Sequence, residues 1–249
     1  MTLSGKRISD RAKERASKLL RQMFGLATDL SAFYHLAARD RRLAPLAHRF
    51  RGLKPPRFPS VFEGLVNAIA CQQLSLTAGI WVLNRLAEKC GPTAHSDGPV
   101  QHGFPQPADI LRLNPDSLRT LGFSFAKARS LLELAQTAET GQLEQEELNK
   151  LNDDQVMERL MNLRGIGRWT AEYALLRGLG RIDVFPGDDV GARNRLAQWL
   201  GRDGSRDGPM DYEAVRRAVR RWHPYSGFVY FHLLLEGLTQ SKALLEDAR

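Results

Sequence analysis

The chain has 249 residues, of which 43% are hydrophobic, and this length is sufficient to bury a core without covalent staples. Its two cysteines, Cys71 and Cys90, are too few for a disulfide scaffold, a four-cysteine metal site or an iron–sulfur cluster. Lysine and arginine outnumber aspartate and glutamate by 36 to 28, and the resulting charge of +8 favours a polyanionic partner, with nucleic acid as the leading candidate.

The chain begins with a segment that has charged residues where a secretory signal peptide would need an apolar core. No uninterrupted apolar run approaches the length that spans a bilayer. We therefore expect a soluble cytoplasmic protein with no membrane partner, associated with the nucleoid in a bacterium or located in the nucleus of a eukaryote. Residues 9–23 are predicted to form a basic helix.

Helical patterns continue through the rest of the chain. Ser60 to Glu63 has the pattern of a capping box, and apolar residues at helical spacing follow it, which predicts a helix over residues 61–71. Further helices are expected at residues 76–91, from 115, at 125–141, on both sides of a glycine turn near 165, and at 212–222 and 226–235. Residues 92–107 are predicted to be a surface loop, and residues 182–185 are the only extended candidate. The predicted fold class is all-α.

A short glycine-rich turn separates two of the predicted helices. The first helix is capped by Asn152 or Asp153, and the second begins at about Arg168. Gly165 and Gly167 permit a close backbone approach, and the first amides of the second helix point outward, which suits a phosphate group. The turn is flanked by the basic residues Arg164 and Arg168, and its outward carbonyls can hold a monovalent cation. A plain helix–helix corner has the same pattern.

Two pairs of side chains near this turn are candidates for a functional site. Trp169 and Tyr173 are four residues apart and share one face of a helix, where they either stack on a planar ring or belong to the core. Asp188 and Asp189 follow a Pro-Gly turn and begin the next helix. One aspartate satisfies an N-cap, whereas two are more than capping requires. A carboxylate at this position is suited to face a developing positive charge.

Several ordered segments resemble a known family. They are LRGIGRWTAEY from Leu163, DVFPGDD from Asp183 and IACQQLS from Ile69. Together they are similar to the helix-hairpin-helix (HhH-GPD) base excision DNA glycosylases, and most similar to the bacterial 3-methyladenine DNA glycosylase II type. The resemblance extends from about Phe24 to Gly237.

The resemblance implies roles for individual residues. Asp189 matches the catalytic aspartate, Trp169 and Tyr173 match aromatic residues of the base pocket, and Tyr225 is the candidate for a further aromatic there. The hairpin that grips the DNA backbone corresponds to Leu163, Arg164, Gly165, Ile166, Gly167 and Arg168, and the region that inserts into the gap left by a flipped base corresponds to Gln72, Gln73 and Leu74. The backbone carbonyls of Met161, Leu163 and Ile166 are the candidates for a structural Na⁺ or K⁺ site.

The resemblance also implies a chemistry. Bifunctional members have a Schiff-base lysine at the position of Trp169, so we expect a monofunctional enzyme without lyase activity. It would hydrolyse the N-glycosidic bond of alkylated purines such as 3-methyladenine and 7-methylguanine after base flipping, during base excision repair. The expected partner is double-stranded DNA with damaged bases, bound by a monomer, and no cofactor or iron–sulfur cluster is expected. A glycosylase for oxidised or deaminated bases and a non-catalytic helix-hairpin-helix DNA-binding protein are the alternatives.

The domain organisation implied by the resemblance is two helical lobes with a DNA-binding cleft between them, without a separate N-terminal β domain. Residues 1–60 are expected to pack with residues 182–249 as one lobe. Residues 61–181 would form the second lobe, with the helix-hairpin-helix at about 153–177.

Overall fold

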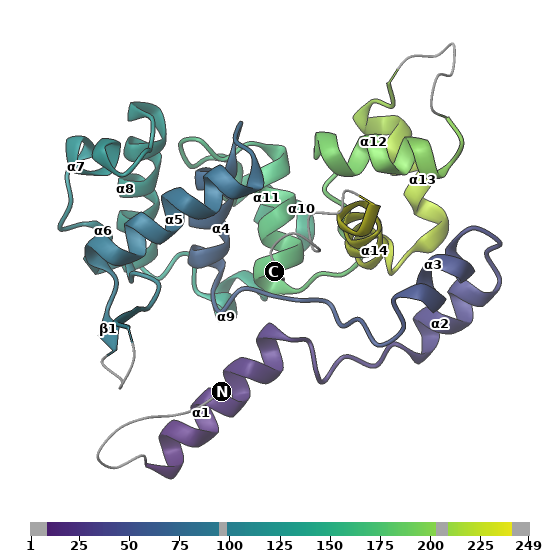
Figure 1. The fold of residues 1–249 in the computed structure, drawn as a ribbon, viewed down its shortest axis with the longest axis horizontal. Coiled ribbons are helices and arrows are strands. Elements are labelled where there is room, and N and C mark those ends of the chain that lie inside the picture. The colour runs from purple at the N-terminus through teal and green to yellow at the C-terminus, as the bar shows by residue number, and fades with distance from the viewer. Residues whose placement is uncertain (1–8, 95–98, 203–208, 241–249) are drawn as a thin grey trace. The chain divides into compact units, whose positions relative to one another are not determined.

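The computed structural model describes residues 9–94, 99–202 and 209–240, and almost all regular structure in this part of the chain is helical (Figure 1). The all-α prediction is confirmed. Two short strands, β1 (Thr93–Ala94) and β2 (Gln101–His102), pair antiparallel inside the segment that was expected to be a loop. None of the described helices combines the length and the apolar composition that crossing a membrane requires.

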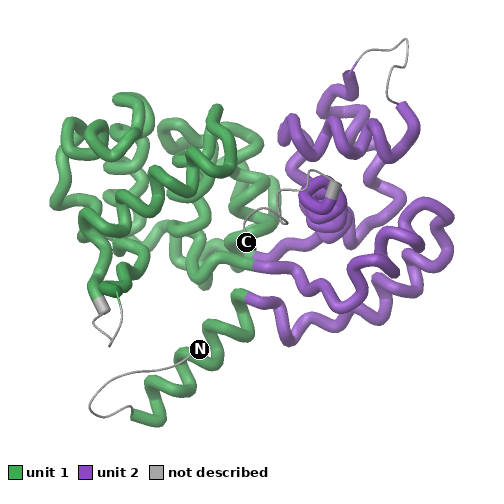
Figure 2. The backbone as a smooth tube through the Cα atoms, in the orientation of Figure 1, with its two compact units in different colours: residues 1–23, 57–179 green, residues 24–56, 180–249 purple. Residues whose placement is uncertain are grey.

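The chain divides into two compact units, which Figure 2 shows in different colours. Unit 1 contains the helix α1 (Asp10–Met23) and residues Arg57–Leu179, and unit 2 contains residues Phe24–Pro56 and the chain from Gly180 onward. The expected division kept residues 1–60 together, whereas in the structure α1 is grouped with unit 1. The side chain of Gln22 explains this, because its Nε2 donates to the carbonyl of Pro59 at 3.4 Å and to Gln145 Oε1 at 3.2 Å, both in unit 1.

Unit 1 is built around the helix α4, which packs against α5, α8, α11 and η1. Eight of its residues are buried, because apolar side chains occur on all of its faces. The elements of unit 1 after α1 are α4 (Val61–Cys71), α5 (Leu76–Cys90), β1, β2, α6 (Pro107–Ile110), α7 (Pro115–Thr120), α8 (Phe125–Glu139), α9 (Gln145–Leu148), α10 (Asp153–Met161), α11 (Arg168–Ala174) and the π-helical η1 (Leu175–Leu179).

The predicted cap of α4 forms through one hydrogen bond. The amide of Glu63 donates to Ser60 Oγ at 3.1 Å, as expected for an N-cap serine. Burial raises the pKa of the Glu63 carboxyl group to about 7. The helix therefore begins as predicted, with an acid at its first turn that is costly to ionise.

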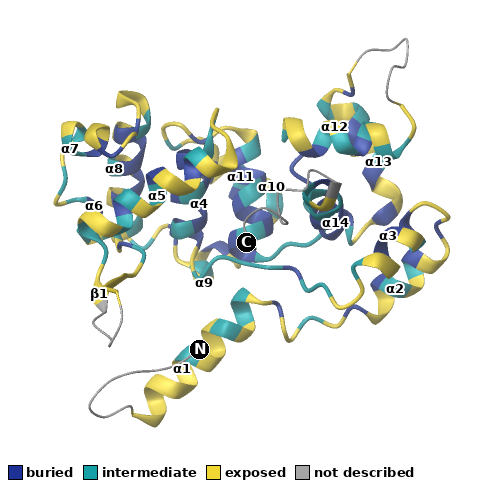
Figure 3. Cartoon of the chain, viewed as in Figure 1, coloured by how far each residue is buried: buried dark blue, intermediate teal, exposed yellow. Residues whose placement is uncertain are grey.

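Unit 2 is organised around the helix α14, in which residues 228–233 are all buried. Figure 3 shows this burial as dark blue along α14, in contrast to the mostly exposed α1. The elements of unit 2 are α2 (Ser31–Ala38), α3 (Leu43–Arg49), α12 (Val190–Trp199), α13 (Tyr212–Val219), the 3₁₀ turn η2 (Arg220–Trp222) and α14 (Ser226–Gln240).

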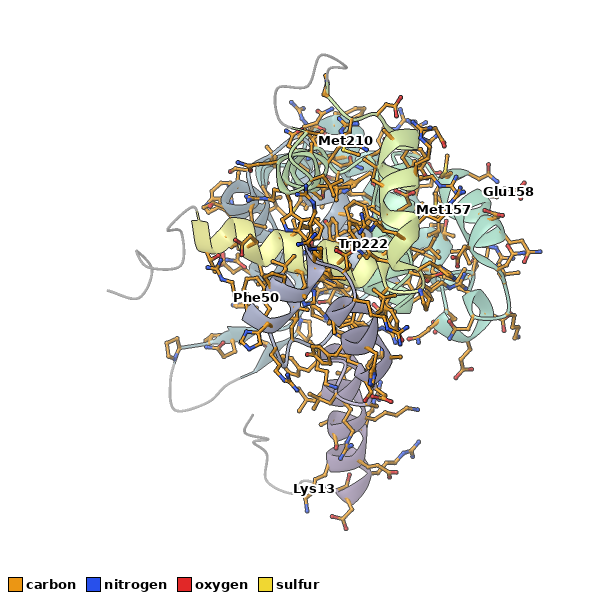
Figure 4. The ribbon with its side chains drawn as sticks, turned by 90° about the vertical axis from the view of Figure 1, so that its right-hand side faces the viewer. Lys13, Phe50, Met157, Glu158, Met210 and Trp222 are labelled. Carbon is orange, nitrogen blue, oxygen red and sulfur yellow. The ribbon has the colours of Figure 1, made fainter. Side chains whose placement is uncertain are left out.

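A buried aspartate connects two distant parts of unit 2. Trp222, labelled in Figure 4, is fully buried, and its indole Nε1 donates to Asp40 Oδ2 at 2.8 Å. The other oxygen of Asp40 accepts the amides of Arg42 at 2.9 Å and Leu43 at 3.1 Å, at the start of α3. These bonds satisfy a carboxylate that burial alone would destabilise.

One extended segment expected from the sequence is absent. Residues 182–185 form no strand, because the amide of Val184 donates to the carbonyl of Arg181 at 3.1 Å and closes a turn. The carbonyl of Ile182 instead accepts the amide of Phe228 at 3.0 Å, which attaches this segment to α14.

Candidate active site and nucleic-acid interface

The predicted hairpin is present as α10, a turn of residues 162–167, and α11. Asn152 caps α10 with both bonds of a capping box, one from the amide of Gln155 at 2.9 Å and one from its own amide to Gln155 Oε1 at 3.0 Å. In the turn, Arg164, Gly165, Gly167 and Arg168 are exposed and Leu163 is half-buried. Ile166 is only 4% exposed, so its side chain anchors the turn in the core of unit 1 and is not available to a ligand.

The two glycines of the turn have different reasons to be glycine. Gly165 has a φ of +75°, and a Cβ at this position would overlap Ser130 Oγ on α8. Gly167 is the N-cap of α11 with a φ of −92°, and nothing lies within 4 Å of the position that its Cβ would occupy. Gly165 is therefore required by the packing of the turn, whereas Gly167 leaves open space at the start of a helix.

Residues of α8 spaced by three support the turn from one side. Glu133 Oε1 accepts the amide of Arg164 at 3.2 Å, and Ser130 contacts Gly165. Lys127 Nζ donates to the carbonyls of Ala70 at 3.0 Å and Gln72 at 2.6 Å, at the end of α4. One face of α8 thus holds the turn through Ser130 and Glu133 and the end of α4 through Lys127.

The segment predicted to enter the DNA gap has two distinct parts. Gln72 Nε2 donates to the carbonyl of Gly165 at 2.9 Å and to Thr170 Oγ1 at 3.1 Å, so this side chain joins the end of α4 to the hairpin. Gln73 has a φ of +55° and is exposed, and Leu74 is 43% exposed. Of the three residues, only Gln73 and Leu74 present their side chains to solvent.

The two aromatic residues of α11 stack on each other at half-buried positions. The ring centroids of Trp169 and Tyr173 are 5.5 Å apart with an interplanar angle of 31°. Phe58 extends this stack, 6.0 Å from Tyr173, and the Arg177 guanidinium lies 4.7 Å from the Phe58 ring and 5.7 Å from Tyr173. Sequence reasoning missed Phe58, because no local pattern connects it to residues more than a hundred positions later.

Asp189 lies in unit 2 at the start of α12, and the structure makes it the N-cap of that helix. Its Oδ1 accepts the amide of Ala192 at 2.8 Å, and its Oδ2 accepts the hydroxyl of Tyr230 at 2.9 Å. Its own amide donates to the carbonyl of Pro186 at 3.1 Å, which closes the Pro-Gly turn. The cap is therefore the second aspartate of the pair, so capping and any chemical role fall on the same residue.

Tyr230 is a hydrogen-bond partner of Asp189 that the sequence analysis did not predict. It is 2% exposed, packs edge-on against Phe185 at 5.4 Å, and directs its hydroxyl at Asp189. A tyrosine within an apolar helix usually needs a partner for its hydroxyl, and this was the available signal.

Tyr225, also in unit 2, is half-buried and packs edge-on against Phe33 with ring centroids 5.6 Å apart. Its amide donates to the carbonyl of Trp222 at 2.6 Å.

More than half of the chain is similar to a family of DNA repair proteins. Residues 66–224 match the model of the HhH-GPD superfamily base excision DNA repair proteins. A DNA-3-methyladenine glycosylase from Bacillus subtilis is 29% identical over 89% of this chain and 73% of its own length.

Two solved structures share the fold. A 3-methyladenine DNA-glycosylase from Archaeoglobus fulgidus has a TM-score of 0.80 and 30% identity, covering 92% of this chain and 76% of that one. The 3-methyladenine DNA glycosylase Mag1 of Schizosaccharomyces pombe, in complex with abasic DNA, has a TM-score of 0.67 and 28% identity, covering 80% of this chain and 92% of that one.

Proposed function

The chain belongs to the HhH-GPD superfamily of base excision DNA repair proteins, and we propose that it is a monofunctional DNA glycosylase that releases alkylated purines from duplex DNA. The names of its relatives support 3-methyladenine as a substrate, and the abasic DNA bound to Mag1 supports DNA as the partner. The observation that carries the proposal is the Asp189 carboxylate, which is held through both oxygens at the start of α12.

The proposed reaction follows from the charge of the substrate. A purine alkylated at N3 or N7 carries a positive charge, so it leaves with the electron pair of the N-glycosidic bond as a neutral base and needs little protonation. The deoxyribose is left with oxocarbenium character, as in glycoside hydrolysis. Water then forms a bond to the anomeric carbon and loses a proton, which gives an abasic site.

Asp189 is the residue proposed to stabilise this sugar cation and to orient the water. The amide of Ala192 and the hydroxyl of Tyr230 each donate to one of its oxygens, which fixes the plane of the carboxylate. A carboxylate already oriented in this way needs no reorganisation as the charge develops.

Trp169 and Tyr173 are proposed to stack on the flipped base. Extruding a base costs a few kcal/mol, and stacking on aromatic side chains offsets part of this cost. The electron-rich faces of the two rings favour a cationic purine over a neutral one. This preference supports alkylated purines as the substrates, ahead of oxidised or deaminated bases.

The turn between α10 and α11 is proposed to hold the DNA backbone. The exposed residues Arg164, Gly167 and Arg168 provide positive charge and an open helix start, which suit a phosphate. A Na⁺ or K⁺ is also proposed at the carbonyls of Met161, Leu163 and Ile166. The Leu163 carbonyl accepts the amide of Ile166 at 3.2 Å, and a carbonyl oxygen has a second lone pair that can coordinate a cation. Such a cation would add positive charge close to the phosphate.

The proposal is tested by incubating the protein with methylated, deaminated and oxidised duplex DNA and identifying free bases by chromatography. We expect 3-methyladenine and 7-methylguanine to be released, with intact abasic sites left in the strand. Borohydride should trap no covalent adduct, because Trp169 occupies the position of the lyase lysine. Release of oxidised or deaminated bases alone would change the substrate class, and release of none would indicate a DNA-binding protein without glycosylase activity.

A further inference from the structure

A cluster of basic residues in unit 2 lies outside the site described above. The turn after α2 contains Arg39, Arg41 and Arg42, and η2 contains Arg220 and Arg221, about 180 positions later in the chain. Arg221 Nη2 lies 2.7 Å from Asp40 Oδ2, the same oxygen that accepts the Trp222 indole. The buried Asp40 therefore brings these two arginine-rich segments together.

We call this cluster the arginine surface. It consists of His35, Arg39, Arg41, Arg42, Arg220 and Arg221, all of which are exposed. His35, Arg39 and Arg221 line one pocket together with Asp40 and Trp222, and Arg41 lines a second pocket. Asp40 is the one carboxylate in the lining of the first pocket, and it is already occupied by hydrogen bonds and by the ion pair with Arg221.

Two of the five arginines of the arginine surface form polar contacts within unit 2. Arg221 pairs with Asp40, and Arg42 Nη1 donates to the carbonyl of Trp199 at 2.7 Å. Within the described residues, the side chains of Arg39, Arg41 and Arg220 form no ion pair or hydrogen bond. Three guanidinium groups are therefore available to an anionic partner without breaking a contact of the fold.

The composition of the arginine surface favours DNA over a protein as its partner. A protein interface has an apolar centre rich in large side chains, whereas a DNA interface is polar and strongly positive. The large hydrophobic residues that are exposed in unit 2, as far as it is described, are Phe24, Leu26 and Val190, and none belongs to the arginine surface. Guanidinium groups also match phosphate geometry with two parallel hydrogen bonds.

We propose that the arginine surface is a second phosphate-binding surface for duplex DNA, carried by unit 2 and independent of the hairpin in unit 1. This inference rests on the proposed function, because it assumes that duplex DNA is the partner. The surface contacts backbone phosphates and reads no bases, so it increases the affinity for damaged and undamaged duplex alike.

The test replaces Arg39, Arg41 and Arg220 by glutamine together, leaving Arg42, Arg221 and Asp40 in place. The matched control replaces Lys89, Arg119 and Lys150 of unit 1 by glutamine, which removes the same charge from exposed positions. Arg119 and Lys150 pair with acids three positions earlier in the chain, and Lys89 forms no ion pair within the described residues. Affinity for undamaged duplex is measured over a range of salt concentrations, and folding is checked by circular dichroism and thermal unfolding.

Each phosphate contact contributes about 0.9 to the slope of log affinity against log salt concentration, so the arginine variant should lose roughly 2 to 3 from that slope, and the control should keep the wild-type slope. Equal slopes for the two variants would overturn the proposal and assign the arginines to solvation or to an acidic protein partner. Excision of alkylated purines by the wild-type protein is measured in parallel. Its absence would refute the proposed function, whereas wild-type excision with equal slopes would refute only the arginine surface.

Discussion

Tyr230 determines how the Asp189 carboxylate is oriented. Its buried hydroxyl donates to Oδ2 at 2.9 Å, while the helix amide of Ala192 holds Oδ1. One of these bonds comes from the backbone, and the other comes from a side chain that lies 41 positions later in the chain. The second bond gives Tyr230 a positioning role that can be measured separately from folding.

Tyr230→Phe should lower the single-turnover excision rate while leaving DNA affinity nearly unchanged. It also removes a buried hydrogen bond that stabilises the fold, so the rate is measured well below the thermal unfolding midpoint of the variant. A hydrogen bond to a charged group contributes about 1.5 to 3 kcal/mol, which corresponds to a loss of roughly 10- to 100-fold in rate if the bond acts mainly in the transition state. Tyr34→Phe, which removes another hydroxyl of unit 2, one that accepts the amide of Gly52, is the control. A rate for Tyr230→Phe equal to that of this control would remove Tyr230 from the site.

In the helix-hairpin-helix element, one substitution at Gly167 should weaken DNA binding without lowering the stability of the fold. Gly167 is an open N-cap, so an aspartate fits there and can cap α11, whereas a side chain at Gly165 would overlap Ser130. Gly167→Asp should therefore fold as stably as the wild type.

The same substitution places a carboxylate where a phosphate is proposed to bind, so the affinity for duplex should fall by a similar factor for all sequences. Gly167→Asn is the matched control, because it has the same size and capping ability without the charge. Equal DNA affinities for the aspartate and asparagine variants would exclude a phosphate at the start of α11.

The elements that could be predicted from sequence are those specified by nearby residues. The cap at Ser60 and the extent of α4 depend on signals within a few positions, and both are confirmed. Of the two caps expected for α10, Asn152 and Asp153, the structure has Asn152. The contact between Gln72 and Gly165 joins residues 93 positions apart, and no local pattern indicates it. Asp189 caps α12 because the turn before the helix closes with a hydrogen bond from its amide to the carbonyl of Pro186. The sequence does not indicate where this turn closes, and so it does not indicate which of the two aspartates is the cap.

At the scale of the whole molecule, the sequence indicated two helical units but misplaced α1. The basic helix was predicted correctly, but its contacts with unit 1 join distant residues: Gln22 donates to Pro59 and to Gln145, and the amide of Arg57 donates to the carbonyl of Met23 at 2.8 Å. The stability of the molecule also depends on a feature invisible in the sequence, the burial of Glu63 at the start of α4. Burial raises its pKa from 4.5 to about 7, so the folded state binds a proton that the unfolded state releases.

Stability should therefore be highest below pH 4.5 with respect to this group and fall as the pH rises towards 7. Glu63→Gln should remove that loss, so the variant gains about 1 to 2 kcal/mol over the wild type at pH 8, after allowance for partial solvent exposure, and little at pH 5. Urea unfolding at the two pH values checks this. A difference between the proteins that is the same at both pH values would contradict it.

The most direct test of the proposed chemistry is single-turnover excision of an alkylated purine by Asp189→Asn. Asparagine keeps the shape of the side chain and can still accept the amide of Ala192, so the cap and the fold should survive. Loss of the negative charge should lower the rate by on the order of 10²- to 10³-fold, the cost of removing one preorganised electrostatic group, while affinity for lesion-containing duplex is retained. Asp188→Asn should keep most of the activity, because the charge proposed to stabilise the sugar cation belongs to Asp189, the carboxylate held at the start of α12. An Asp189→Asn protein that excises the base within a few-fold of the wild-type rate would contradict the assignment of Asp189 as the catalytic residue.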